Sequence, residues 1–174
     1  MLLVLALAAV LAVLLLSGGK HRSGERAAGN PARVVRVVDG DTFVASAGGR
    51  TFYVRLLGID TPETHRPGTP VECGGPEASA NMRALIASGA RVRLETDPGQ
   101  DSIDRYGRLL AYVWLSDGRL LEQAQLESGW ANTYVFEGRP VSLFPRLAAA
   151  AREARDAGRG AWLRCGGDFH SASR

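Results

Sequence analysis

Three short β-branched segments, joined by tight turns, limit most strongly what this chain can fold into. Residues 33–38, 42–45 and 51–57 are rich in valine, threonine and aromatic side chains, a composition typical of strands. The turn sequences DGD at 39–41 and AGG at 47–49 separate them. Three consecutive short strands predict an antiparallel meander that curls into a small barrel.

The rest of the chain alternates between helical and strand patterns. Apolar residues recur at helical spacing in three segments, 76–88, 119–128 and 141–157. The first begins with a proline and an acid, as helices commonly do, and Gly89 follows it. Two further strands are predicted at 91–95 and 108–115. We therefore expect an α+β protein, a five-stranded OB-type β-barrel with about three α-helices.

The N-terminal segment predicts export. Residues 2–16 are unbroken apolar, yet the run is shorter than the roughly 20 residues that span a bilayer, and resembles a signal-peptide core. No basic residue precedes the run and no clear A-x-A site follows it, so residues 1–17 are either a signal peptide or a membrane anchor. We expect a flexible linker at 18–32, one domain at 33–168 and a tail at 169–174.

The chain has two cysteines, Cys73 and Cys165. An exported chain meets an oxidising compartment, where such a pair usually forms a disulfide. This bond would add roughly 4 kcal/mol of stability by the chain-entropy model. Two free thiols are the alternative, and a zinc site is disfavoured because no histidine is spaced beside either cysteine.

The overall charge is mildly basic. The formal net charge is +3 and the sequence pI is about 9.2. This balance suits a polyanionic partner, although many basic proteins never contact nucleic acid. The charge therefore supports a nucleic-acid partner without identifying one.

The segment at 54–64, VRLLGIDTPET, places charges where burial is costly. It is an apolar strand interrupted by Arg55, and it ends in an acidic turn that contains Asp60 and Glu63. Buried charges require partners. Hard cations bind carboxylate and carbonyl oxygens, and arginine binds phosphate with two parallel hydrogen bonds. A divalent cation and a nucleic-acid phosphate are therefore the predicted partners.

Four short motifs occur in a fixed order: VDGDT at 38–42, RLLGIDTPE at 55–63, GPEAS at 75–79 and DRYGR at 104–108. Each is common alone, but together they resemble the thermonuclease family, the staphylococcal-nuclease-like domains. The resemblance covers about residues 35–165. It implies an exported, calcium-dependent nuclease that hydrolyses DNA and RNA, favours single strands, shows little sequence specificity and leaves 3′-phosphates. A monomer is expected.

The resemblance also implies the residues of a metal site and a catalytic site. Asp41, Asp60 and the carbonyl of Thr61 would hold Ca²⁺, with Asp39 in support. Glu63 would orient or deprotonate the attacking water. Arg55 and Arg108 would bind the phosphate and stabilise the transition state.

For substrate binding, the resemblance implies Arg105, Tyr106 and Tyr134. Phe136 would retain stacking without a hydroxyl. Stacking tolerates any base. Core packing of Tyr134 and Phe136 is the alternative. His21 and His170 fall in the linker and the tail and look incidental, and His65 receives no role.

Two other function classes remain open. The chain could be a non-catalytic OB-type module that binds nucleic acid, or a surface domain tethered through residues 2–16. Degenerate domains of this family lose their acids and arginines. Asp41, Asp60, Glu63, Arg55 and Arg108 are all present, which favours the enzyme.

Overall fold

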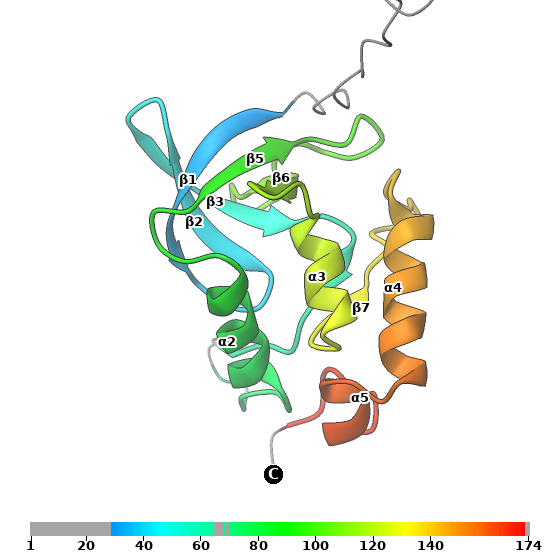
Figure 1. Cartoon of the computed structure of the whole chain (residues 1–174). Coiled ribbons are helices and arrows are strands. Elements are labelled where there is room, and N and C mark those ends of the chain that lie inside the picture. Colours follow the sequence, from blue (N-terminus) through cyan, green and yellow to red (C-terminus); the bar gives the residue numbers. More distant parts are fainter. Residues whose placement is uncertain (1–28, 65–67, 69, 173–174) are drawn as a thin grey trace, which may run out of the picture.

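The computed structural model describes residues 29–64, 68 and 70–172 (Figure 1). The predicted signal peptide or anchor and most of the predicted linker lie outside the described residues, as does His65. Among the described residues, no helix combines the length and apolar character needed to cross a membrane.

Five strands close into a barrel in the order β1-β2-β3-β6-β5. Their bounds are β1 Asn30–Val37, β2 Thr42–Ala47, β3 Arg50–Leu56, β5 Arg91–Glu95 and β6 Leu109–Leu115. The β3 and β6 strands are parallel, and all other neighbours in the barrel are antiparallel. The predicted five-stranded OB-type barrel is therefore confirmed, and β1 begins at Asn30, inside the predicted linker.

The turn between β1 and β2 contains a glycine for a packing reason. A β-carbon on Gly40 would lie 2.6 Å from the hydroxyl oxygen of Thr61 and 2.8 Å from the β-carbon of Ala78. Real β-carbons do not approach other atoms this closely. Because Gly40 has no side chain, the turn can pack directly against Thr61 of the acidic turn and against Ala78 of the first helix.

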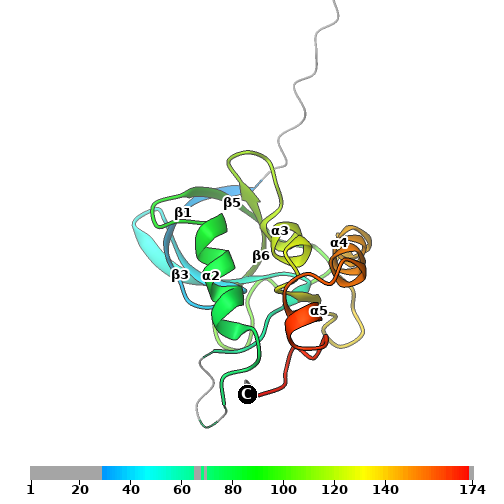
Figure 2. The same cartoon turned by 60° about the horizontal axis from the view of Figure 1, so that its bottom comes forward.

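Helix α2 (Gly75–Leu85) lies below the barrel in Figure 1 and in front of it in Figure 2, so it covers one end. Its Met82 is fully buried in the barrel core. The helix ends at Leu85, before the predicted end near Gly89. Ile86 adopts an extended conformation and is itself buried at 1% exposure, so packing of this side chain ends the helix early.

The other helices lie beside the barrel. They are α3 (Leu121–Glu127), α4 (Phe144–Asp156) and α5 (Ala161–Arg164). The α3 and α4 helices pack against each other, and Figure 1 shows them on one side of the barrel. The described residues thus contain four helices where about three were predicted, because α5 is too short to show a helical period.

A second small sheet was not predicted. It pairs β4 (Ile59–Asp60) with β7 (Asn132–Thr133), so that Asp60 lies opposite Asn132. Each strand is only two residues long and shows no alternation. The pairing holds Asp60, at the start of the acidic turn, against the loop that follows α3.

Two polar side chains of α3 are fully buried. The Gln125 amide donates to the carbonyls of Gly40 (2.8 Å) and Ala78 (2.9 Å), which ties α3 to the first turn and to α2. Glu122 accepts a hydrogen bond from the amide of Val113 in β6 (3.1 Å). Helical periodicity places both residues correctly in a helix but does not reveal these contacts.

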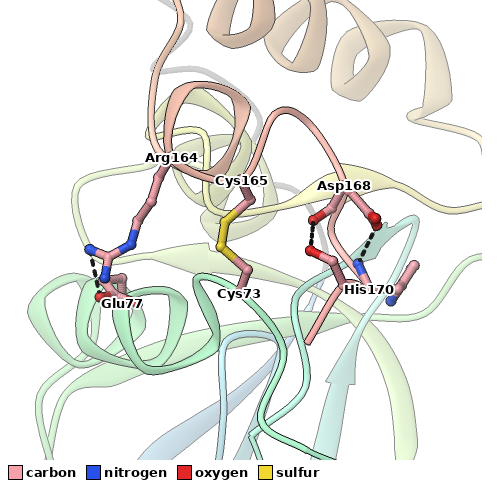
Figure 3. Close-up of a disulfide and its surroundings, with 7 residues drawn as sticks. Cys73, Glu77, Arg164, Cys165, Asp168 and His170 are labelled. Atoms are coloured by element: carbon pink, nitrogen blue, oxygen red, sulfur yellow. Dashed lines mark hydrogen bonds and ion pairs between the residues drawn. A yellow bond between two sulfur atoms is a disulfide. The ribbon is translucent and has the colours of Figure 1, made fainter. Parts of the chain in front are cut away.

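The structure joins Cys73 and Cys165 in a disulfide, which connects the start of α2 to the end of α5 (Figure 3). Arg164 forms an ion pair with Glu77 beside it (2.8 Å). Beyond the disulfide, the ring of Phe169 is buried against Trp162. The folded part of the chain therefore extends into the predicted tail.

Candidate active site

One pocket of about 360 Å³ gathers most of the predicted site residues. It is lined by Asp39, Asp41, Arg55, Asp60, Thr61, Pro62, Glu63, Glu72, Tyr106, Arg108 and His170. The first turn, the end of β3 with its continuation, the loop before β6 and the C-terminal segment all contribute. Of the predicted residues, Arg105 and Tyr134 do not line this pocket.

Arg55 is the central cation of the pocket. Its guanidinium donates to the carbonyls of Leu56 (2.9 Å) and Ile59 (2.8 Å), because the chain turns back immediately after β3. It also pairs with Asp41 (3.1 Å) and Asp60 (2.6 Å). The charge of the arginine that interrupts the apolar strand is thus paired with Asp41 and Asp60.

The charges of this cluster influence one another strongly. Burial would lower the pKa of Arg55, but Asp41, Asp60 and Asp39 together raise it above its ordinary value. Burial raises the pKa of Asp60, and Arg55 offsets this effect only in part. Burial and repulsion from Asp41 raise the pKa of Asp39 to about 7. The three carboxylates of Asp39, Asp41 and Asp60 therefore carry more negative charge than Arg55 alone balances.

Asp41 fixes the position of the acidic turn. Its carboxylate accepts hydrogen bonds from the amide and the hydroxyl of Thr61, both at 3.1 Å, and from the hydroxyl of Thr42 at 2.9 Å. The side chain is 8% exposed. The residues predicted to share a metal ion, Asp41 and Thr61, therefore lie in direct contact.

The donor atoms fit a hard divalent cation. Five of the described residues that line the pocket are acidic, against two arginines and one histidine. Burial, together with the neighbouring carboxylates, raises the pKa values of Asp39 and Asp60, and a cation beside them would favour their charged forms. Among the described residues, no three His, Cys, Asp or Glu side chains form a ready metal cluster. The predicted set is smaller, with two carboxylates and one carbonyl.

Glu63 is held at its backbone by two neighbours. Its amide donates to the carboxylate of Glu72 (2.7 Å). Its carbonyl lies against Gly75, where an added β-carbon would be 2.9 Å from this oxygen. The side chain of Glu63 also accepts a hydrogen bond from the amide of Thr64 (2.8 Å). The start of α2 therefore sets where this acid sits.

The loop before β6 is organised by Asp104. Its carboxylate accepts from the amides of Tyr106 and Arg108, both at 2.9 Å, and from the side chain of Arg108 at 2.6 Å. Burial would raise the pKa of Asp104, but these hydrogen bonds lower it below its ordinary value. Arg108 thereby faces the pocket with a fixed carboxylate behind it.

The three aromatic side chains with predicted stacking roles are exposed, and Tyr106 lines the pocket. Tyr106 is 67% exposed, with the guanidinium groups of Arg105 and Arg108 at 4.8 and 5.3 Å from its ring centre. Tyr134 and Phe136 are 44% and 46% exposed, so the alternative that they pack in the core is wrong. All three rings are accessible for stacking on a ligand.

Two ionisable residues of the pocket, Glu72 and His170, were not predicted to lie there. His170, which looked incidental, lies 3.5 Å from Asp60 and 3.2 Å from Glu72. That interpretation is wrong because the disulfide turns the C-terminal segment back toward the acidic turn. Since Cys73 directly follows Glu72, the predicted disulfide was the signal that could have placed this segment near the site.

Comparison with known proteins gives one consistent result. Residues 53–164 match the family model described as staphylococcal nuclease homologue. The chain is 42% identical over 118 residues to a thermonuclease of Staphylococcus intermedius, a match that covers 66% of this chain and 68% of that protein. It is 47% identical over 83 residues to a thermonuclease of Staphylococcus hyicus, covering 48% and 47% of the two chains.

A similar match occurs outside that genus. The chain is 43% identical over 103 residues to the endonuclease YncB of Bacillus subtilis, which covers 59% of this chain and 47% of that protein. The chain thus spans about half the length of two of these three relatives.

Proposed function

Because the chain belongs to the staphylococcal nuclease homologue family, we propose that it is a nuclease that hydrolyses phosphodiester bonds with the help of a divalent cation. One observation carries the proposal. Arg55, Arg108, Asp41, Asp60 and Glu63 gather in one pocket, although they come from separate segments. The names of the similar thermonucleases and the endonuclease support the same reaction class.

The arginines would recognise the phosphate. Arg55 and Arg108 line the same pocket and are partly shielded from solvent, with side-chain exposures of 12% and 28%. Phosphodiester hydrolysis builds negative charge on the phosphate oxygens, and guanidinium groups in fixed positions stabilise such charge. We assign the transition-state contacts to these two side chains.

Glu63 would accept the proton of the attacking water. Its backbone is fixed by Glu72 and Gly75, and the residue lines the pocket. As water attacks phosphorus, the bond to the 5′-oxygen of the next nucleotide breaks, which leaves a 3′-phosphate. Proton transfer to a positioned carboxylate typically contributes about 100- to 10,000-fold to such a rate.

Asp41, Asp60 and the carbonyl of Thr61 are the residues that would hold the cation, for which we propose calcium. A bound divalent cation supplies positive charge to the phosphate and lowers the pKa of a bound water. Asp39 is close enough to Asp41 for the two carboxylates to repel each other, and it would support the site without binding the ion directly.

Exposed rings and arginines would bind the nucleic acid. Tyr106 with Arg105, and Tyr134 beyond the pocket, present surfaces on which any base can stack. We therefore propose DNA and RNA substrates, with single strands favoured because their bases are free to stack. The protein would act as a monomer.

Export remains part of the proposal. The apolar residues 2–16 lie outside the described part, and they would direct export either as a signal peptide or as a membrane anchor. The Cys73–Cys165 disulfide supports an oxidising compartment.

Digestion of heat-denatured DNA by the purified chain tests the function. We expect degradation with calcium, no degradation once a chelator removes the ion, and fragments that carry 3′-phosphates. Activity that persists in chelator would reject the metal assignment. Binding to single-stranded DNA without cleavage under any divalent cation would favour the OB-type binding module instead.

A further inference from the structure

The C-terminal segment at 165–172 returns to the edge of the active site. Its first residue, Cys165, is bonded to Cys73, and the amide of Cys73 donates to the carbonyl of Ser171 (2.7 Å). Ala172 forms a β-bridge with Glu72. The two ends of the segment are thus attached to two consecutive residues, Glu72 and Cys73, which lie shortly before α2. Figure 3 shows the disulfide end of this attachment.

Glu72 connects this segment to the catalytic acid. It is only 9% exposed, and one of its carboxylate oxygens accepts a hydrogen bond from the amide of Glu63 (2.7 Å). The same oxygen lies 3.2 Å from Nδ1 of His170. The other ring nitrogen of His170 lies 3.5 Å from Asp60. A continuous set of contacts therefore runs from the C-terminal segment to both sides of the acidic turn.

We propose that Glu72 is a positioning residue for Glu63 and that the segment at 165–172, held by the disulfide, keeps Glu72 in place. The inference rests on the proposed function. Glu72 would act through the backbone of Glu63 and would not touch the substrate. The contact suits this role because a buried carboxylate that accepts a backbone amide forms a strong hydrogen bond.

The energetic reason is the sensitivity of catalysis to small displacements. A shift of about 1 Å in a catalytic group can reduce the rate about 100-fold. The turn at 60–64 is attached to the barrel through Asp41 and Thr61 on one side. Glu72 provides the attachment on the other side, directly at the residue whose carboxylate must meet the water.

If the segment only stabilised the fold, loss of any contact that holds it should lower kcat equally. The segment is also held by the ion pair between Arg164 and Glu77 and by the packing of Phe169 on Trp162. These contacts stabilise the same segment without touching Glu63. Glu77 therefore offers a matched control, since it is an acid that binds the same part of the chain away from the pocket.

The experiment compares Glu72→Ala, Glu72→Gln and Glu77→Ala in the full chain. With calcium and denatured DNA, we expect Glu72→Ala to lower kcat about 10- to 100-fold, as loss of a supporting contact typically does, with little change in KM. Glu72→Gln keeps an acceptor oxygen and should recover most of kcat. Glu77→Ala should keep the kcat of the unaltered chain.

Amide hydrogen exchange at Glu63, followed by NMR, reports the contact without relying on activity. The amide should exchange at least about tenfold faster in Glu72→Ala, because its acceptor is lost, and should stay protected in Glu72→Gln and Glu77→Ala. Unchanged exchange and kcat in Glu72→Ala would overturn the proposal, as would equal losses of kcat in Glu72→Ala and Glu77→Ala.

Two further variants keep the test decisive if Glu72→Ala does not fold. His170→Ala and the double substitution Cys73→Ser with Cys165→Ser should both accelerate exchange at Glu63 and lower kcat, because each loosens Glu72. No effect in either would reject the role of the segment. An unaltered chain without nuclease activity would refute the proposed function, while the exchange measurement would still decide the positioning.

Discussion

At the scale of single residues, Arg55 shows why charge type alone does not explain this site. Its guanidinium contacts two carbonyls and two carboxylates in different directions. A lysine carries the same charge but has no planar group that could reach them together. The geometry of the side chain, beyond its charge, therefore holds Asp41 and Asp60 in the pocket.

This difference yields the first prediction. Arg55→Lys should lower kcat about 100- to 1000-fold, because the transition state loses a donor with fixed geometry. The variant keeps a cation near Asp41 and Asp60, so urea unfolding should show a folded protein. Arg119→Lys, which alters an exposed pair with Asp117, is the control and should keep the rate. A normal rate in Arg55→Lys would contradict the assigned role.

Asp39 gives a second prediction at this scale. Burial and the charge of Asp41 raise its pKa to about 7 in the metal-free protein. The fold therefore favours the protonated acid, and this contribution to stability is lost as the pH rises from about 4 toward 7. A cation bound beside Asp39 would lower the pKa and reverse the trend.

Carboxyl ¹³C NMR titrations with chelator and with calcium measure this effect. The midpoint for Asp39 should lie near pH 7 in chelator and clearly lower in calcium. Identical midpoints in the two titrations would show that no cation binds beside this residue.

At the scale of elements, the start of α2 and the acidic turn form one unit. Gly75 begins the helix and lies against the carbonyl of Glu63, and Gly40 allows the first turn to approach Thr61. Neither glycine has a positive φ. Both are required by close packing, so the barrel, the turn and the helix meet at distances that only glycine permits.

A third prediction follows for Gly75→Ala. The new methyl group would lie 2.9 Å from the carbonyl oxygen of Glu63, so the acidic turn or the helix must shift. We expect a loss of about 1–3 kcal/mol in unfolding free energy, typical of overpacking, together with a fall in kcat.

Ala80→Gly provides the control for Gly75→Ala. This residue lies on the exposed face of α2, and the substitution should destabilise the helix by about 1 kcal/mol without changing the rate. Equal rates in Gly75→Ala and the unaltered chain would contradict the coupling of α2 to Glu63. Nuclease rates and urea unfolding of Gly75→Ala, Ala80→Gly and the unaltered chain measure these effects.

At the scale of the whole molecule, α3 joins the site to the barrel through buried polar groups. Gln125 contacts the first turn and α2, and Glu122 contacts β6. Burial raises the pKa of Glu122 to about 8, against opposing contributions from Val113 and Arg146. The folded protein thus keeps a neutral acid in its interior up to mildly alkaline pH.

The fourth prediction concerns the pH dependence of stability. Between pH 4.5 and 8, the unfolded chain releases the Glu122 proton while the folded protein retains it, so folding becomes less favourable as the pH rises. Glu122→Gln removes this loss and keeps an acceptor for Val113. It should be more stable than the unaltered chain at pH 8, by at most about 5 kcal/mol, and equally stable near pH 4.

Urea unfolding at the two pH values measures the difference. Glu153→Gln, at an exposed acid, should change stability little at either pH. A constant difference between Glu122→Gln and the unaltered chain across this range would show that Glu122 does not retain its proton in the folded state.

Local patterns account for most of the barrel and helices. The strand at 91–95 and the first hairpins follow from β-branched residues and turn sequences, and α3 and α4 from apolar periodicity. The small sheet of β4 and β7, the helix α5 and the early end of α2 could not be predicted in this way. Each is short, and each is stabilised by contacts with residues distant in the sequence.

The sequence by itself determined the barrel, the residue types of the pocket and the family, because periodicity, turns and ordered motifs are local properties. Only the tertiary structure decided which charges meet. It paired Arg55 with Asp41 and Asp60, and it brought His170 and Glu72 to the acidic turn. Such contacts depend on how distant segments pack, and a disulfide between Cys73 and Cys165 places the C-terminal segment where no local pattern points.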